Sequence, residues 1–84
     1  MYFVYILKSL VNSKTYVGYT SKAVTERLKE HNAGSNKWTK GYSPFKLIYY
    51  EQFACEPDAI VREKFLKSGL GRKLKQLIVS NFGV

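Results

Sequence analysis

Tyr16, Arg27 and His31 lie within one short stretch of the chain, and each carries a side chain that can act on a phosphate group. A guanidinium can hold a phosphate through two hydrogen bonds and stabilise developing negative charge. An imidazole can donate or accept a proton near neutral pH, and a phenol becomes a usable base when a cation or a metal lowers its pKa. Residues 16–31 are therefore a candidate site for acid–base chemistry on an anionic substrate.

A structural role for the same residues is the alternative. Glu26 and Glu30 lie on the same expected helix, where they could pair with neighbouring bases and form a solvated face. Tyrosines are common in strands and often place the hydroxyl at the rim of a core. Gly18, between the tyrosine strand and the helix, permits either the close approach of a substrate or a bulge.

Two more residues would complete such a site. Tyr5 lies in an apolar N-terminal run that is the expected hairpin partner of the Tyr16 strand. Glu63 shares a helical stripe with Ala59 and Leu66, and a carboxylate at the edge of a core is costly unless it is paired or binds a metal. The alternatives for Glu63 are exposure to solvent or an ion pair with Arg62, Lys67 or Arg27.

Hydrophobic periodicity and turn signals predict the elements that position these groups. Residues 2–9 and 15–19 read as strands joined by a polar turn at 10–14, which favours an antiparallel hairpin. Alternation along the second strand places Tyr16 and Gly18 on one face.

The middle of the chain is expected to add one helix and one strand. Residues 22–32 have helical periodicity, with Ser21 as the expected N-cap and Gly34 as a left-handed stop. Residues 45–53 have the strongest β composition in the chain and are long enough to form the central strand.

The C-terminal third reads as two helices. Pro57 suits the first turn of a helix that runs to about residue 67, and a second helix is expected at 72–81. The core positions expected there are Leu70, Leu74, Leu77 and Ile78. The order β-β-α-β-α-α predicts a single α+β domain, residues 1–84, in which helices flank a three-stranded antiparallel sheet.

The charge of the chain points to a polyanionic partner. Fourteen Lys and Arg residues oppose six acids, giving a net charge of +8, which favours nucleic acid first and an anionic membrane surface second. No apolar run approaches the ~20 residues of a membrane span. One Cys and one His make a closed zinc site poorly supported, and the single Cys suggests a reducing compartment, hence the cytoplasm.

Basic and aromatic residues concentrate in two acid-poor regions, 31–50 and 62–75. Lysines beside stacking rings suit a nucleic-acid strand, although Trp38 could equally belong to the core. The candidate nucleic-acid contacts are Lys37, Trp38, Lys40, Lys46, Arg62, Lys67, Arg72, Lys73 and Lys75.

Taken together, the motifs resemble those of the GIY-YIG nuclease superfamily. The likeness rests on Phe3-Val4-Tyr5, Tyr16-Val17-Gly18, Arg27, His31 and Ala59-x-x-x-Glu63, in the expected order over nearly the whole chain. It is strongest to small single-domain members related to the nuclease domain of the excinuclease C subunit. The chain departs from the family pattern in having Phe-Val-Tyr as its first motif, and in lacking the asparagine that several members have about twelve residues after the glutamate.

The resemblance implies hydrolysis of a DNA phosphodiester with one divalent metal, Mg²⁺ or Mn²⁺. Glu63 corresponds to the metal ligand, and Tyr16 to the tyrosine that activates the attacking water, assisted by Tyr5. Arg27 corresponds to the cation that stabilises the transition state, and His31 to a residue with a proton-transfer role in some members. We expect DNA as the partner, with other nucleic acid as a further candidate, no membrane, and a monomer or a weak dimer.

Two other functions remain open at this point. The same scaffold could bind nucleic acid without cleaving it, in which case binding would need no metal and would depend steeply on salt. A small interaction protein with no nucleic-acid role would bind neither DNA nor RNA at low salt.

Overall fold

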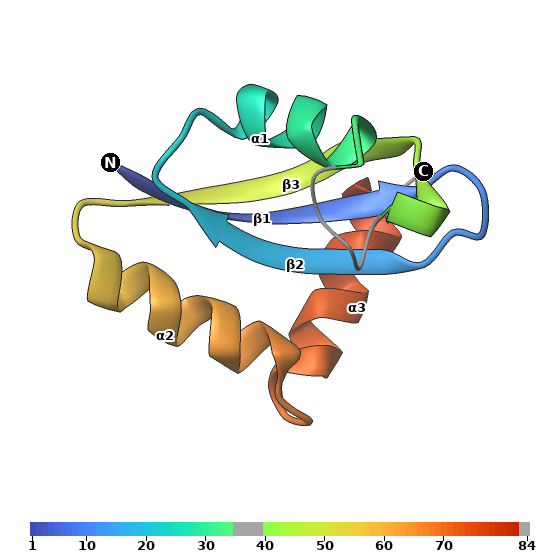
Figure 1. Ribbon diagram of the computed structural model, residues 1–84. Coiled ribbons are helices and arrows are strands. Elements are labelled where there is room, and N and C mark those ends of the chain that lie inside the picture. The colour runs from blue at the N-terminus through green and yellow to red at the C-terminus, as the bar shows by residue number, and fades with distance from the viewer. Residues whose placement is uncertain (35–39, 83–84) are drawn as a thin grey trace.

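A three-stranded antiparallel sheet forms the centre of the computed structural model, which describes residues 1–34 and 40–82 (Figure 1). Its strands are β1 (Tyr2–Ser9), β2 (Thr15–Thr20) and β3 (Phe45–Phe53), in the order β2-β1-β3. The expected hairpin of β1 and β2 is confirmed, but β1 is the central strand and β3 is an edge. The apolar run in the middle of β1 suits a central strand, because its side chains alternate between the two faces of the sheet and are buried on both.

The helices cover the two faces of this sheet (Figure 1). α1 (Val24–Asn32) lies on one face, while α2 (Glu56–Lys67) and α3 (Gly71–Phe82) lie on the other, and a short 3₁₀ turn, Lys40–Tyr42, precedes β3. The predicted α+β order β-β-α-β-α-α is confirmed. None of the described helices has the length and hydropathy needed to cross a membrane.

Alternation along the strands gives the sheet two separate cores. Val4, Ile6 and Val17 pack with α2 and α3, whereas Tyr5 and Leu7 pack on the α1 side. The α2–α3 side is purely apolar at its centre, and the α1 side contains the buried tyrosine. The hairpin therefore places Tyr5 on the α1 face of the sheet and its aliphatic residues Val4, Ile6 and Val17 on the other.

Several local expectations differ from the structure. Ser21 does not cap α1, which begins at Val24 after Ala23 and has no side-chain cap. Instead the hydroxyl of Thr20 accepts a hydrogen bond from the backbone N–H of Lys22, 3.0 Å away. Gly34 ends the helix with φ 83°, as expected.

Two of the four core residues predicted for the last helix are exposed in the structure. Leu70 and Leu77 are 75% and 62% exposed, and only Ile78 and the partly buried Leu74 reach the core. Helix α3 starts at Gly71, where a Cβ atom would lie 1.7 Å from the backbone oxygen of Phe65. The start of α3 is thus pressed against the end of α2, and this contact sets the direction in which α3 leaves.

Candidate active site

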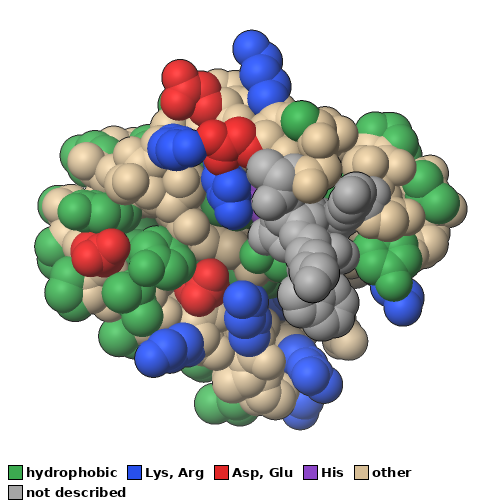
Figure 2. Space-filling view, in the orientation of Figure 1, with side chains coloured by type: hydrophobic (Ala, Val, Ile, Leu, Met, Phe, Trp, Pro, Cys, Tyr) green, Lys and Arg blue, Asp and Glu red, His purple; other side chains and the backbone are tan. Residues whose placement is uncertain are grey.

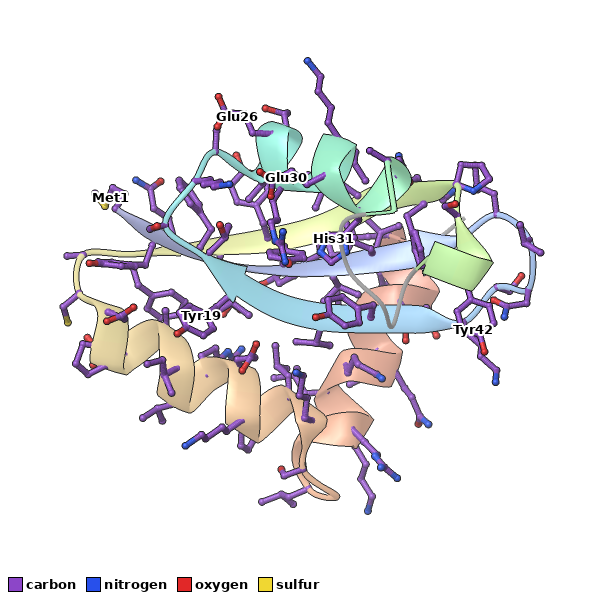
Figure 3. All side chains as sticks on the ribbon, viewed as in Figure 1. Met1, Tyr19, Glu26, Glu30, His31 and Tyr42 are labelled. Atoms are coloured by element: carbon purple, nitrogen blue, oxygen red, sulfur yellow. The ribbon has the colours of Figure 1, made fainter. Side chains whose placement is uncertain are left out.

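Tyr5 and His31 form the buried centre of the candidate site. The Tyr5 hydroxyl and His31 Nε2 are 2.9 Å apart, although the residues come from β1 and α1. Tyr5 is 2% exposed and His31 is fully buried. The ring of Tyr16 on β2 completes the group, with its centroid 5.1 Å from that of His31 and 6.4 Å from that of Tyr5. Figure 3 shows His31 between α1 and the sheet.

Gly18 makes room for this cluster. It pairs with Tyr5 across the β1–β2 ladder, and a Cβ atom at Gly18 would lie 2.5 Å from the Tyr5 hydroxyl oxygen and 3.1 Å from Cε2 of Tyr16. The glycine is therefore required by the two phenol rings. The expectation that it admits a substrate or forms a bulge is not what the structure shows, because the space belongs to Tyr5.

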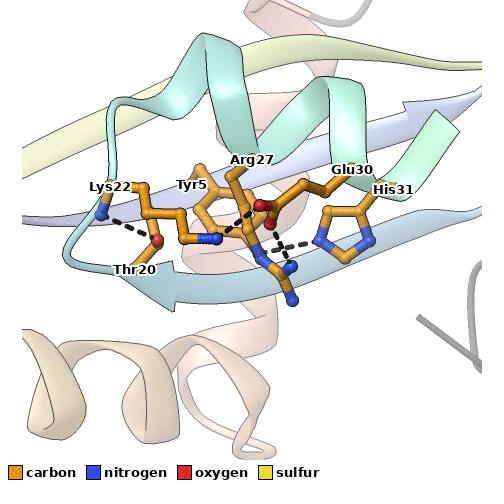
Figure 4. Close-up of polar contacts among 6 residues, drawn as sticks. All are labelled: Tyr5, Thr20, Lys22, Arg27, Glu30 and His31. Atoms are coloured by element: carbon orange, nitrogen blue, oxygen red, sulfur yellow. Dashed lines mark hydrogen bonds and ion pairs between the residues drawn. The ribbon is translucent and has the colours of Figure 1, made fainter. Parts of the chain in front are cut away.

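Arg27 lies over the cluster and is held by Glu30. Arg27 Nη1 donates to Glu30 Oε1 at 2.7 Å, and Lys22 pairs with the other oxygen of the same carboxylate (Figure 4). The Arg27 cation also acts on the Tyr5 phenol, where it opposes part of the rise in the pKa of that group. Glu30 thus pairs with neighbouring basic side chains, as the structural alternative predicted. The ion pair with Glu30 holds Arg27 in place. The i, i+3 spacing is the sequence signal for this pair.

Burial keeps Tyr5 and His31 uncharged. It raises the pKa of Tyr5 to about 12, although the Arg27 cation opposes part of that rise. Burial, together with the nearby Arg27 cation, lowers the pKa of His31 to about 4. A neutral imidazole carries its proton on one ring nitrogen only, and the tautomer of His31 decides whether Nε2 accepts from the Tyr5 hydroxyl or donates to it.

The lowered pKa of His31 predicts an acid-sensitive fold. The unfolded chain takes up a proton near pH 6.5 and the folded chain only near 4, so the free energy of unfolding falls as the pH falls through this window, by about 1.4 kcal/mol per pH unit. His31 is the single histidine. We expect a loss of about 2 kcal/mol between pH 6.5 and 5 in urea unfolding.

The matched variant for that experiment is His31→Gln, which retains a polar partner for Tyr5 but does not titrate. Its free energy of unfolding should be nearly constant between pH 6.5 and 5. An equal pH dependence in the two proteins would show that the imidazole of His31 is not buried in its neutral form.

Glu63 reaches the site from α2, which lies beneath the edge strand β2 (Figure 1). Its side chain is 17% exposed and its Oε2 lies 3.6 Å from Nζ of Lys67, so the alternative of an ion pair with Lys67 is present in the structure. The same Lys67 Nζ lies 5.7 Å from the centroid of the Tyr16 ring. The charge of Glu63 also helps to raise the pKa of Tyr5. Lys67 therefore links the Glu63 carboxylate to the ring of Tyr16.

These contacts bring all five predicted catalytic residues to one region around β2. Figure 2 shows that the face carrying them is mixed, with acidic side chains over α1 and α2 and with Lys and Arg side chains gathered over the C-terminal half of α2 and over α3. Within the described residues, no group of three or more His, Cys, Asp or Glu side chains could hold a metal ion. The donor set, a single carboxylate, suits a metal ion that keeps most of its water ligands.

The predicted nucleic-acid contacts divide into five groups, of which Arg62 is described separately below. Arg72 and Lys75 line a groove with Tyr16 and Lys67, and its volume is about 480 Å³. Lys73 is exposed on α3 and is not among the residues that line it. Lys46 stands on β3, which β1 separates from β2. Lys37, Trp38 and the Lys40 side chain lie outside the described part of the chain.

Arg62 is not brought to the site. Its Nε and Nη2 donate to the two carboxylate oxygens of Glu51 on β3, at 2.8 and 3.0 Å. This bidentate pair joins α2 to β3 and occupies the guanidinium. The sequence indicates Glu63 as an ion-pair partner for Arg62 because the two residues are neighbours. Glu51 lies on a different element, so local spacing does not predict its pairing with Arg62.

Comparison with known proteins places the chain among small nuclease-like domains. A family model described as the GIY-YIG catalytic domain matches residues 1–76. A UPF0213 protein of Clostridium perfringens is 40% identical over 81 residues, covering 95% of this chain and 85% of its own. One from Haloquadratum walsbyi is 39% identical over 77 residues, covering 90% and 84%.

A solved structure supports the same relationship. The solution NMR structure of a UPF0213 protein of Bacillus halodurans is 34% identical, with a TM-score of 0.58, and the match covers 99% of this chain and 88% of that one. The likeness thus extends over the whole α+β fold and includes every element that contributes to the site.

Proposed function

Because the chain belongs to the GIY-YIG catalytic domain family, we propose that it is a metal-dependent DNA endonuclease. The observation that supports this most directly is the convergence of Tyr5, Tyr16 and His31 under Arg27, with the Glu63 carboxylate alongside. These are the groups needed to activate water, to stabilise charge on a phosphate and to hold a metal ion. The family establishes a nuclease scaffold, and the geometry supports activity for this chain.

The environments of the two tyrosines support different roles. Tyr5 is buried and its pKa is raised to about 12, so it keeps its proton and serves to orient Arg27 and His31. Tyr16 is only partly buried and lines the groove, which gives its hydroxyl access to a water molecule. We therefore assign the proton-accepting role to Tyr16.

Arg27 supplies the cation for the reacting phosphate. It is already held by its ion pair with Glu30, so little reorganisation is needed when negative charge develops. His31 remains neutral at physiological pH, and the hydrogen bond between its Nε2 and the Tyr5 hydroxyl fixes the position of the phenol. In this role His31 positions Tyr5 and does not exchange protons with the substrate.

Glu63 is the residue that would hold the metal, and Mg²⁺ fits a site with one carboxylate because it retains waters and binds substrate phosphates. When bound, the ion would neutralise phosphate charge and stabilise the leaving oxygen. Lys67, 3.6 Å from Glu63, balances the carboxylate in its absence. Glu63 can therefore accept the ion by changing one exposed ion-pair partner.

The test is cleavage of single-stranded, duplex and branched DNA in Mg²⁺ or Mn²⁺. We expect cleavage by the wild-type protein that stops in EDTA, and a loss of at least about a hundredfold in Tyr16→Phe, in line with the effect of a general base. Tyr2→Phe removes a phenol hydroxyl from the α2–α3 side of the sheet and is the matched control. Metal-independent binding without cleavage would overturn the proposal and favour a binding module.

A further inference from the structure

A groove leads away from Tyr16 along the free edge of the sheet. Its first part, the depression of about 480 Å³ described above, lies between β2 and α3. A second depression of about 650 Å³ continues it, because Thr15 and Lys75 line both. Lys14 lines the far end, in the turn before β2. The groove thus runs from the catalytic tyrosine past Lys75 to Lys14.

The groove is basic and has no acidic residues among the segments that form it. Residues 1–25 and 64–84 contain no Asp or Glu. Arg72 and Lys75 repel each other, and burial together with the Arg72 charge lowers the pKa of Lys75. Among the described residues, no carboxylate pairs with Lys14, Arg72 or Lys75. Lys14 and Arg72 are exposed and Lys75 is partly buried, and three cations along one groove with no carboxylate partner favour a polyanion as the occupant.

The other end of β2 has the opposite character. Thr20 pairs with Phe3, and Phe53 pairs with the adjacent Tyr2, so the Thr20 end of β2 and the start of α2 lie at the same end of the sheet (Figure 1). The first turn of α2 carries Glu56 and Asp58. Lys22 lies at this end but pairs with Glu30, so a polyanion extending in this direction would leave the cations of the groove and meet carboxylates.

Building on the proposed function, we propose that the groove binds the phosphodiester backbone on one side of the scissile bond only. Lys67 lies nearest the reacting phosphate, and Arg72, Lys75 and Lys14 bind the phosphates that follow. The protein therefore binds the substrate strand on one side of the scissile bond and makes few contacts with the strand on the other side. The ligand is a chain of phosphodiesters, and either a single strand or one strand of a duplex could supply it.

The first experiment measures binding without cleavage. Fluorescence anisotropy in EDTA compares a fluorescein-labelled dT15 with a 15-base-pair duplex across a salt series. The double variant Arg72→Ala/Lys75→Ala is compared with Lys29→Ala/Lys64→Ala, which removes two exposed cations from α1 and α2. For the groove variant we expect Kd to rise about tenfold with dT15, and the slope of log K against log salt to fall by about 1.4.

The outcomes separate the possibilities. If the groove variant loses more affinity than the control variant, the proposed role of the groove is supported. Whether this loss occurs with dT15, with the duplex or with both identifies the form of nucleic acid that the groove binds. Equal losses in the groove and control variants would overturn it, because binding would then follow net charge alone. Since this assay involves no cleavage, its result is independent of whether the protein is a nuclease.

A second experiment tests binding on one side of the scissile bond by measuring KM for cleavage. An oligonucleotide carries a central phosphodiester, and neutral methylphosphonate linkages replace either the 5′ or the 3′ flank. Neutralising the flank held by the groove should raise KM about tenfold, the effect of losing about two phosphate contacts. Neutralising the other flank should change KM less than twofold. Equal effects of the two flanks would overturn the proposal.

Discussion

Glu63→Gln is expected to reduce metal-dependent DNA cleavage about a thousandfold, which corresponds to about 4 kcal/mol of transition-state stabilisation. The substitution preserves the size of the side chain but removes the charge that would hold the metal ion, and the described part of the site offers no second carboxylate cluster to replace it. The fold should persist, because the lost pair with Lys67 is partly exposed and contributes little. Single-turnover cleavage rates and thermal unfolding of the same samples measure the two effects.

Glu56→Gln is the matched control for charge. It removes an exposed carboxylate from the first turn of the same helix, far from the tyrosine cluster. We expect it to cleave at close to the wild-type rate. If Glu63→Gln cleaved as fast as Glu56→Gln, the assignment of Glu63 as the metal ligand would be wrong.

Gly18→Ala should affect both catalysis and stability. The added methyl group would lie 2.5 Å from the Tyr5 hydroxyl oxygen and 2.7 Å from Cζ, so the phenol must move away from His31 and Arg27. Tyr5 is buried and has little freedom, and overpacking of this kind costs about 2 kcal/mol. A displacement of catalytic groups by about 1 Å can slow a reaction about a hundredfold, which is the loss we expect in the cleavage rate.

Gly41→Ala gives the control for the same chemical change. A Cβ at Gly41 would meet no heavy atom within 4 Å. Urea unfolding and cleavage rates should therefore be close to wild type. A Gly18→Ala protein that retained full activity would show that the contact between Gly18 and Tyr5 is not needed to hold the site.

The features predicted from the sequence are those set by local chemistry. The Tyr5–Tyr16 hairpin follows from β-forming residues around a polar turn, and Gly34 and Pro57 mark the expected helix boundaries. The stripe that contains Glu63 follows from helical periodicity. The burial of His31 against Tyr5 depends on the packing of α1 on the sheet and does not follow from its spacing to Arg27.

The features that were not predicted depend on packing between distant segments. The central position of β1 depends on which strands pair, and neither strand length nor β composition determines this. Leu70 and Leu77 have the spacing of core residues, but the direction of α3 is set by the contact at Gly71 and leaves them exposed. The close contact of Gly18 with the rings of Tyr5 and Tyr16 depends on the exact distances between strands, which cannot be read from the spacing of residues in the sequence.

The side chain of Asn32 joins the end of α1 directly to the start of β3. Its Nδ2 donates to the Phe45 carbonyl at 3.2 Å, and its Oδ1 accepts from the Phe45 N–H at 2.6 Å. The two ends of the connection between these residues are therefore fastened independently of the chain that joins them. Since His31 immediately precedes Asn32, the connection could change in length or sequence between species, or receive an engineered insertion, without moving the imidazole. The position of His31 can thus stay constant while the length and sequence of the neighbouring connection vary.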